Sequence, residues 1–207
     1  MSKEFFNSRA AIWDDQVTEK DSSKLEAMAA RLEIEAGATV LDVGTGTGVF
    51  TPFLLQKIGS EGKLVCLDFA EEMLKIAISK GFRGNISFLC SDIEDNQLAD
   101  KSFDAVVCYS VFPHFQNKPK TLSEIHRLLK EDGCLYICHT SSRQSINEIH
   151  QSQPEVYDHL FPENESIRQM LSETGFVDIY INDGKDDYLI TAKKSDISCV
   201  RKRKKAK

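Results

Sequence analysis

The feature that most constrains the fold is the segment Val40-Leu41-Asp42-Val43-Gly44-Thr45-Gly46-Thr47-Gly48. A β-branched apolar run, typical of a buried strand, leads directly into glycines at alternate positions. Glycine permits a tight turn and lets a ligand lie against bare backbone. The first turn of a following helix offers unpaired N–H groups. The segment therefore predicts a strand, a ligand-binding loop and a helix.

The spacing of these glycines argues against two common types of nucleotide-binding loop. A dinucleotide fingerprint has the pattern Gly-x-Gly-x-x-Gly, and here the third glycine comes one residue early. No Lys-Ser or Lys-Thr follows, so the loop is not a phosphate-binding P-loop. Asp42 stands two residues before the first glycine. A carboxylate at that point would repel a pyrophosphate and tolerate an ammonium group.

Short apolar runs alternate with segments of helical periodicity along most of the chain. The candidate strands are 39–43, 63–67, 86–90, 103–108 and 134–138, and the clearest helical pattern covers 119–130. Near-continuous apolar strands are typical of parallel sheets covered on both faces. Strands that alternate with helices indicate an α/β, doubly wound, mostly parallel sheet.

The last part of the pattern predicts an antiparallel hairpin. A helix is expected from Pro162 to just before Gly175, and two short strands, 177–181 and 188–192, flank Asp183-Gly184. The sheet then has seven strands. Two further helices, about 3–15 and 20–34, precede the first strand. The expected organisation is a helical segment over 1–36, a ligand-binding domain over 37–194 and a tail over 195–207.

The charge distribution separates the tail from the body. The chain carries 26 Lys and Arg against 32 Asp and Glu, and six of the basic residues lie in 195–207. The remainder is therefore strongly acidic, which argues against general binding to nucleic acid backbones. The low-complexity tail could bind RNA or an anionic membrane, act as a nuclear localisation signal, or simply increase solubility. Its sequence does not distinguish these alternatives.

Three observations bear on the compartment. The apolar runs are all shorter than the roughly 18 residues of a membrane helix. The first residues lack the apolar stretch of a signal peptide. The six cysteines form no Cys-x-x-Cys pair, and most lie in apolar runs. We expect a cytoplasmic protein with reduced thiols.

Five segments, in order, resemble the class I S-adenosylmethionine-dependent methyltransferases, in particular the small-molecule group around the ubiquinone and menaquinone C-methyltransferases. They are the glycine loop 42–48, Leu67-Asp68-Phe69, Asp92-Ile93, 103–109 and the approach to the fifth strand, 128–135. The resemblance covers roughly residues 5–194. It implies a Rossmann-like methyltransferase fold, S-adenosylmethionine as cofactor and a small-molecule methyl acceptor of the kind that includes aromatic and quinone-like compounds.

The resemblance also implies which residues bind the cofactor. Asp42 would face its charged methionine end, Asp68 its ribose hydroxyls, and Asp92 with Ile93 its adenine. The full expected set is Asp42, Gly44, Thr45, Gly46, Gly48, Asp68, Phe69, Asp92, Ile93 and Tyr109. Asp68 follows Gly48 by 20 residues, where an acid at the end of a second strand reaches a ribose bound at the loop. Helix capping and turn formation remain alternative roles for Asp68 and Asp92.

The acceptor side is expected where the fourth and fifth strands end. Tyr109, His114 and His139 are the candidates to orient or deprotonate the acceptor. The segment after Tyr109 lacks the Asn-Pro-Pro-Tyr type of motif found in relatives that methylate amino groups. Convergence of His114, His139 and His150 could create a metal or substrate site, but their spacing forms no local ligand motif, and we expect no metal. Arg143 could bind an anionic substrate or a surface carboxylate.

The aromatic residues Phe5, Phe6 and Trp13 suggest that the first helix is a lid that excludes water, although plain packing on the sheet would also explain them. The favoured interpretation is therefore an enzyme that methylates a small molecule. The alternatives are a nucleoside, RNA or protein-binding module with the same fold, and a methyltransferase acting on RNA or protein.

Overall fold

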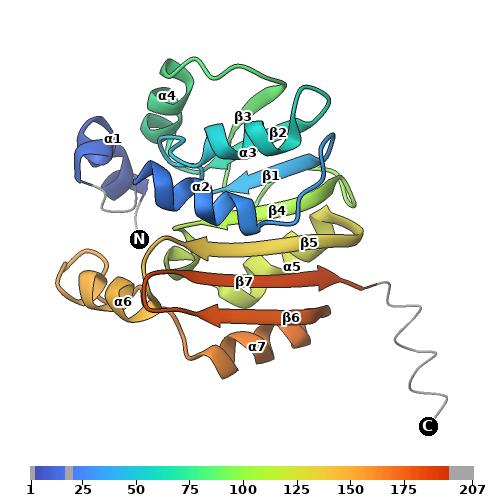
Figure 1. Cartoon of the computed structure of the whole chain (residues 1–207). Coiled ribbons are helices and arrows are strands. Elements are labelled where there is room, and N and C mark those ends of the chain that lie inside the picture. The colour runs from blue at the N-terminus through green and yellow to red at the C-terminus, as the bar shows by residue number, and fades with distance from the viewer. Residues whose placement is uncertain (1–2, 17–20, 196–207) are drawn as a thin grey trace, which may run out of the picture.

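The computed structural model describes residues 3–16 and 21–195. Seven strands form one sheet in the order β3-β2-β1-β4-β5-β7-β6 (Figure 1). Their bounds are β1 Thr39–Val43, β2 Lys63–Asp68, β3 Ile86–Cys90, β4 Phe103–Tyr109, β5 Leu129–His139, β6 Phe176–Asp183 and β7 Tyr188–Lys194. Strands β1 to β5 pair in parallel, and β7 pairs antiparallel with both β5 and β6. The predicted doubly wound sheet with a C-terminal antiparallel hairpin is confirmed.

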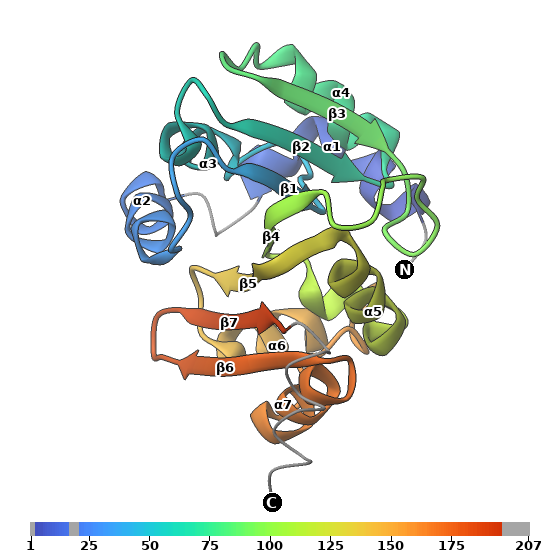
Figure 2. The ribbon, with the colours of Figure 1, turned by 90° about the vertical axis from the view of Figure 1, so that its right-hand side faces the viewer.

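The helices connect the strands and cover both faces of the sheet. They are α1 Lys3–Gln16, α2 Ser22–Arg31, α3 Thr51–Ile58, α4 Glu71–Ser79, α5 Lys118–Leu128, α6 Arg143–Gln151 and α7 Asn164–Glu173, with a 3-10 turn η1 at Phe112–His114. Figure 2 shows α2 and α3 on one side of the twisted sheet and α5 on the other. Side-chain oxygens cap three of them: Asp21 accepts two N–H groups at the start of α2, and Asn117 and Ser142 each accept one, at the starts of α5 and α6.

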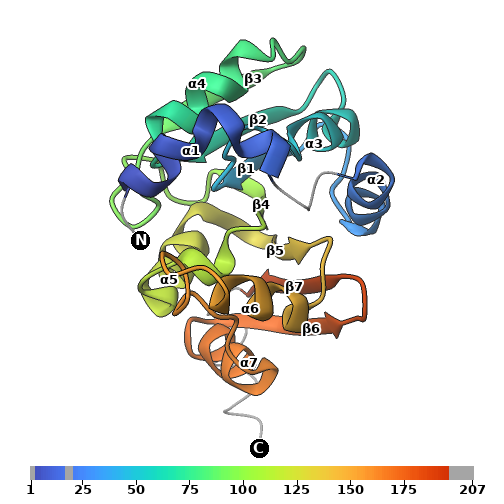
Figure 3. The same cartoon turned by 90° about the vertical axis from the view of Figure 1, so that its left-hand side faces the viewer.

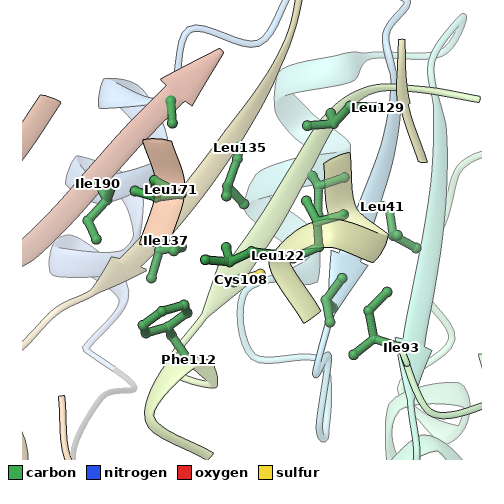
Figure 4. Packing of buried hydrophobic residues seen from close by; sticks show 14 of the residues in the cluster. Leu41, Ile93, Cys108, Phe112, Leu122, Leu129, Leu135, Ile137, Leu171 and Ile190 are labelled. Atoms are coloured by element: carbon green, nitrogen blue, oxygen red, sulfur yellow. The ribbon is translucent and has the colours of Figure 1, made fainter. Parts of the chain in front are cut away.

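The apolar residues of the parallel strands divide between two cores. One core joins Leu41, Cys108 and Leu135 of the sheet to Leu122 of α5 and Leu171 of α7, and Figure 4 shows these helical side chains facing the strands. The other core packs α2 and α3 against the opposite face. Because both faces are buried, the strands need apolar residues at consecutive positions, which explains their near-continuous apolar sequence.

The boundary between α5 and β5 differs from the prediction. The periodicity of 119–130 extends the helix too far, since α5 ends at Leu128 and β5 already begins at Leu129. Leu129 pairs with Phe103 and Cys134 pairs with Ala105, so the residues between Leu129 and Cys134 form an irregular bulge. Asp132, in this bulge, has a φ of 61°. Long-range pairing with β4 overrides the local helical preference here.

The carboxyl ends of the parallel strands lie at one edge of the sheet. Figures 1 and 3 show α1 and α6 at this edge, with α1 near the ends of β1 and β2 and α6 nearer β5 and β7. In such sheets the ligand crevice lies outside the carboxyl ends of the strands. Within the described part of the chain, no helix has the length and apolar character needed to cross a membrane. The basic residues of the tail lie outside the described residues.

Candidate active site

A cavity of about 610 Å³ occupies the carboxyl edge of the sheet. It is lined by the glycine loop, by the ends of β2, β4 and β5, by the loop after β3, and by side chains of α1 and α6. The segments that the sequence marks as functional thus meet in one place, although they are far apart in the chain. Nearly all the predicted site residues line the cavity: Gly44, Thr45, Gly46, Asp68, Phe69, Asp92, Ile93, Tyr109, His114 and His139.

The three glycines of the loop differ in why a larger residue would not fit there. All three have positive φ: 71° at Gly44, 57° at Gly46 and 80° at Gly48. A Cβ atom on Gly44 would lie 2.3 Å from Cγ2 of Val111, and one on Gly48 would lie 2.8 Å from a ring carbon of Phe82. At Gly46 the nearest atom is 4.0 Å away. Packing within the protein excludes a side chain at Gly44 and Gly48, whereas Gly46 leaves room for a ligand.

Asp42 lies beneath this loop on β1 and is 2 % exposed. The Thr45 hydroxyl donates a hydrogen bond to its carboxylate at 2.9 Å. The pKa of Asp42 is raised to about 7, mainly by burial and also by the charge of the neighbouring Asp68, while the Thr45 hydrogen bond acts in the opposite direction. A cation bound nearby would favour the ionised form.

Asp68 closes β2 and is also almost buried. Its carboxylate accepts the N–H of Gly46 at 2.7 Å and the N–H of Ala70 at 2.8 Å. Burial raises its pKa, and these backbone hydrogen bonds oppose that rise. Asp68 therefore connects the glycine loop to Ala70, the residue that caps α4. The same carboxylate also lies in the cavity wall.

The loop after β3 forms the next part of the wall. Ile93 is buried there, and Asp92 is exposed and accepts the N–H of Glu94 at 2.8 Å. This bond fits the turn-forming role that the sequence left open for Asp92. Phe69 and Met73 also line the cavity, so the region beside Asp68 offers apolar surface with carboxylates at its border.

The ends of β4 and β5 place Tyr109 and His139 in the same cavity. The Tyr109 ring stacks on Phe50 at 4.5 Å, and its hydroxyl is 2.9 Å from the hydroxyl of Thr140. His139 is buried, with its ring edge against Phe161. Both side chains are thus held within the wall by their neighbours, and neither depends on a bound ligand for its orientation.

Helix α1 covers the cavity with its aromatic residues. The Phe6 ring lies 5.6 Å from the rings of Phe69, Trp13 and His114 alike. Polar contacts hold the helix in place. Asp14 accepts the hydroxyl of Thr47 in the glycine loop, and Asn7 accepts the N–H of Glu72 at the start of α4. Ion pairs join Asp14 to Lys80 and Arg9 to Glu155. Helix α1 therefore touches both the loop and the far half of the cavity.

Three histidines meet in that far half, but they are not the expected three. His114 Nδ1 lies 3.1 Å from Nδ1 of His159, and the His114 and His150 rings are 4.9 Å apart. His150 Nδ1 forms a very short hydrogen bond with the backbone carbonyl of His159. We call His114, His150 and His159 the histidine cluster. His139 lines the same cavity and packs against Phe161 instead.

No local sequence pattern points to His159, because it follows α6 in a segment without regular structure. Asn147 fixes this segment: its side chain accepts the N–H of Phe161 at 2.8 Å and donates to the carbonyl of the same residue at 3.3 Å. Within residues 3–16 and 21–195, no three or more His, Cys, Asp or Glu side chains are arranged to hold a metal ion. Arg143 pairs with Glu163 and Asp183, which supports the surface alternative for that residue.

Comparison with known proteins identifies the family. A methyltransferase domain family matches residues 34–192. The ubiquinone/menaquinone biosynthesis C-methyltransferase UbiE of Marinomonas is 26% identical over 170 residues, covering 69% of this chain and 68% of the relative. The malonyl-[acyl-carrier protein] O-methyltransferase of Acetivibrio thermocellus is 31% identical over 119 residues, covering 58% and 41%. The match spans about half the length of several such relatives.

A solved structure shares the fold. A chain from the complex of the Haloferax volcanii methyltransferase activator Trm112 with a methyltransferase superposes with a TM-score of 0.75 at 23% identity, covering 92% of this chain and 98% of that chain. The residues at the cavity fit the cofactor of this family, because Gly46 leaves an open position in the glycine loop and the nearly buried Asp68 carboxylate lines the same cavity. The chain belongs to the methyltransferase domain family and is an S-adenosylmethionine-dependent methyltransferase.

Proposed function

We propose that the enzyme methylates a small aromatic, quinone-like acceptor held in the same cavity as the cofactor. The observation that carries this proposal is the continuity of the cavity from the glycine loop to the aromatic and histidine-lined half beneath α1 and α6. Its volume lies within the roughly 300–1,000 Å³ typical of small-molecule sites. The similarity to UbiE proteins, whose name refers to quinone biosynthesis, supports an acceptor of this class.

The cofactor would occupy the half of the cavity at the glycine loop. We propose that Gly44, Thr45, Gly46 and Gly48 contact it through the backbone, that Asp42 faces its charged methionine end, and that Asp68 accepts its ribose hydroxyls. The remaining proposed contacts are Phe69, Asp92 and Ile93 around the adenine, with Tyr109 toward the methionine end. The support is the near-complete burial of both carboxylates, Asp68 in the cavity wall and Asp42 behind the wall residue Thr45, where two hydroxyls and a cation would stabilise them.

The acceptor would occupy the other half, beside Tyr109, His114 and His139. When bound, S-adenosylmethionine supplies an electrophilic methyl group attached to a good leaving group. The protein then contributes mainly alignment and exclusion of water, and good alignment alone supplies roughly 7–11 kcal/mol. Phe6 and Trp13 cover the site and would exclude water, while the packed Tyr109 and His139 side chains give the acceptor a rigid wall.

A product assay with a panel of acceptors tests this function. The formation of demethylated cofactor is measured with hydroquinones, catechols, amines, carboxylates, RNA and protein extracts, using the full chain and a chain ending at residue 194. We expect turnover with small hydroxylated aromatics by both chains. Turnover only with RNA or protein, lost on truncation, would contradict the proposal and support a macromolecular acceptor.

The substitution Gly46→Ala tests where the cofactor lies, and Gly59→Ala is its matched control. Both glycines have a left-handed φ, 57° and 67°, and neither has an atom closer than 4.0 Å to an added Cβ. Each substitution should destabilise the protein through backbone strain, by about 1–2 kcal/mol at Gly46 and by at least as much at Gly59, whose ψ is −167°. Only Gly46→Ala puts a methyl group into the cavity, so it alone should weaken cofactor binding, roughly tenfold or more, as measured by isothermal titration calorimetry. Equal affinities in the two variants would place the cofactor elsewhere.

A further inference from the structure

The hydrogen bonds of the histidine cluster define which nitrogen of each ring carries a proton. His150 Nδ1 bonds the backbone carbonyl of His159. A carbonyl oxygen can only accept, so this nitrogen must carry the hydrogen. In the neutral ring the other nitrogen, Nε2, is then the one with a lone pair. His150 lines the cavity, at the end of α6.

The same reasoning applies to the other two rings. The side-chain amide nitrogen of Gln116 lies 3.2 Å from Nε2 of His159 and donates to it. A neutral His159 therefore carries its proton on Nδ1 and donates it across the 3.1 Å contact to Nδ1 of His114. His114 in turn carries its own proton on Nε2. The adjacent rings of His114 and His150 are thus complementary, one with an N–H donor and the other with a basic nitrogen.

We propose that His150 is the general base for the methyl acceptor, that the Nε2–H of His114 donates a hydrogen bond to the same acceptor, and that His159 is a positioning residue that fixes the tautomer of His114. The inference rests on the proposed function and narrows its substrate to a molecule with an ionisable hydroxyl group. Such a hydroxyl can donate to His150 and accept from His114 at the same time.

Burial and nearby positive charge favour the neutral forms of His114 and His159. Burial lowers the pKa of His114 well below its usual value, and the neighbouring His150, His159, His139 and Lys118 lower it further. Burial also lowers the pKa of His159, with Lys118 and His150 acting in the same direction and Asp158 opposing them. Lys118 is fixed by bonds from its ammonium group to the carbonyls of Pro113 and Phe115. A neutral cluster can accept one proton, which is the property that a base needs.

In the proposed step, His150 accepts the proton that the methyl acceptor loses. The hydroxyl proton moves to Nε2 of His150, and the electron pair of the O–H bond stays on the acceptor, which becomes a stronger nucleophile at oxygen or at the adjacent ring carbon. His150 becomes an imidazolium whose new charge lies beside His114. Burial disfavours a charged imidazole in this cluster, which favours release of that proton to solvent.

Nitrogen-15 NMR of histidine-labelled protein tests the tautomers directly, at pH 7.5 and with the demethylated cofactor bound. We expect His150 and His159 to carry hydrogen on Nδ1, and His114 on Nε2. In His159→Phe the His114 tautomer should become mixed, whereas His150 should keep its hydrogen on Nδ1, because its partner is a backbone carbonyl. A His150 ring protonated on Nε2, or on both nitrogens, would overturn the inference.

Phenol and anisole provide a matched pair of probes for the hydroxyl requirement. Phenol can donate to His150, and anisole, its methyl ether, cannot. His150→Asn keeps an amide nitrogen near the position of Nδ1 but removes the basic nitrogen. We expect this variant to bind phenol roughly tenfold more weakly, the effect of about one hydrogen bond, and anisole unchanged. With a hydroquinone as acceptor, its kcat should fall by roughly 10²–10⁴, with KM for the cofactor unchanged.

Two controls separate this inference from the proposed function. His126→Asn removes a histidine of α5 that contacts Phe176 outside the cavity, and it should leave phenol binding and kcat as in the wild type. If the wild-type enzyme binds the cofactor but His150→Asn keeps full turnover and phenol affinity, the base assignment fails alone. If the wild-type enzyme turns over no small acceptor, the proposed function fails, and the NMR result still decides the tautomers.

Discussion

Replacing Asp68 with alanine is expected to weaken S-adenosylmethionine binding by roughly 100-fold or more. The carboxylate is 6 % exposed, lines the cavity and already accepts the N–H of Gly46 at 2.7 Å. Hydrogen bonds to a charged group contribute about 1.5–3 kcal/mol each, so losing two ribose hydroxyl contacts alone accounts for this factor. The substitution also removes the acceptor that holds the glycine loop, which adds to the loss.

Isothermal titration with S-adenosylmethionine and with its demethylated product measures this effect. Asp68→Asn keeps the shape and one oxygen acceptor, so its affinity should lie between those of the wild type and the alanine variant. Asp186→Ala removes an exposed carboxylate of the β6–β7 turn and should leave binding unchanged. Affinity retained in Asp68→Ala, in a variant whose unfolding curve shows a folded protein, would refute the ribose assignment.

The substitution Asp42→Asn is expected to stabilise the cofactor-free protein at alkaline pH while weakening cofactor binding. Burial raises the pKa of Asp42 from 3.8 to about 7. The folded protein therefore holds a proton that the unfolded chain has already lost, and the free energy of unfolding falls as pH rises through this interval. Between pH 5 and pH 8 this one group should remove roughly 3 kcal/mol of stability. An amide has no such dependence.

Urea unfolding of the cofactor-free protein at pH 5, 6, 7 and 8 checks the sign and the size of this effect. The wild type should lose stability toward pH 8, and Asp42→Asn should show a smaller loss, with the rest arising from the raised pKa of Asp68. Thr45→Val removes the hydroxyl that donates to Asp42, so it should raise the pKa of Asp42 further and steepen the loss. A wild-type stability that rises from pH 5 to pH 8 at the same slope in all three proteins would contradict the account.

The sequence was most informative where one short segment contains its own physical reason. The apolar run that ends in Asp42, with glycines at alternate positions, predicted β1 and the loop correctly, because strand propensity and glycine geometry are local properties. The Asp183-Gly184 pair predicted the hairpin of β6 and β7 for the same reason. The end of α5 was placed wrongly, since the pairing of Leu129 with Phe103 depends on a strand far back in the chain.

The residues of the candidate site also divide into those that the local sequence predicts and those that it does not. Parallel strands bring their carboxyl ends together, so motifs at strand ends could be assigned to one cavity from the sequence alone. The histidine cluster could not be predicted in this way, because its contacts depend on side chains that meet only after folding. His114 and His159 are 45 residues apart and are joined through a loop whose path Asn147 fixes. The sequence by itself thus determined the sheet and the glycine loop, whereas only the tertiary structure decided which histidines meet, because their contacts join residues far apart in the chain.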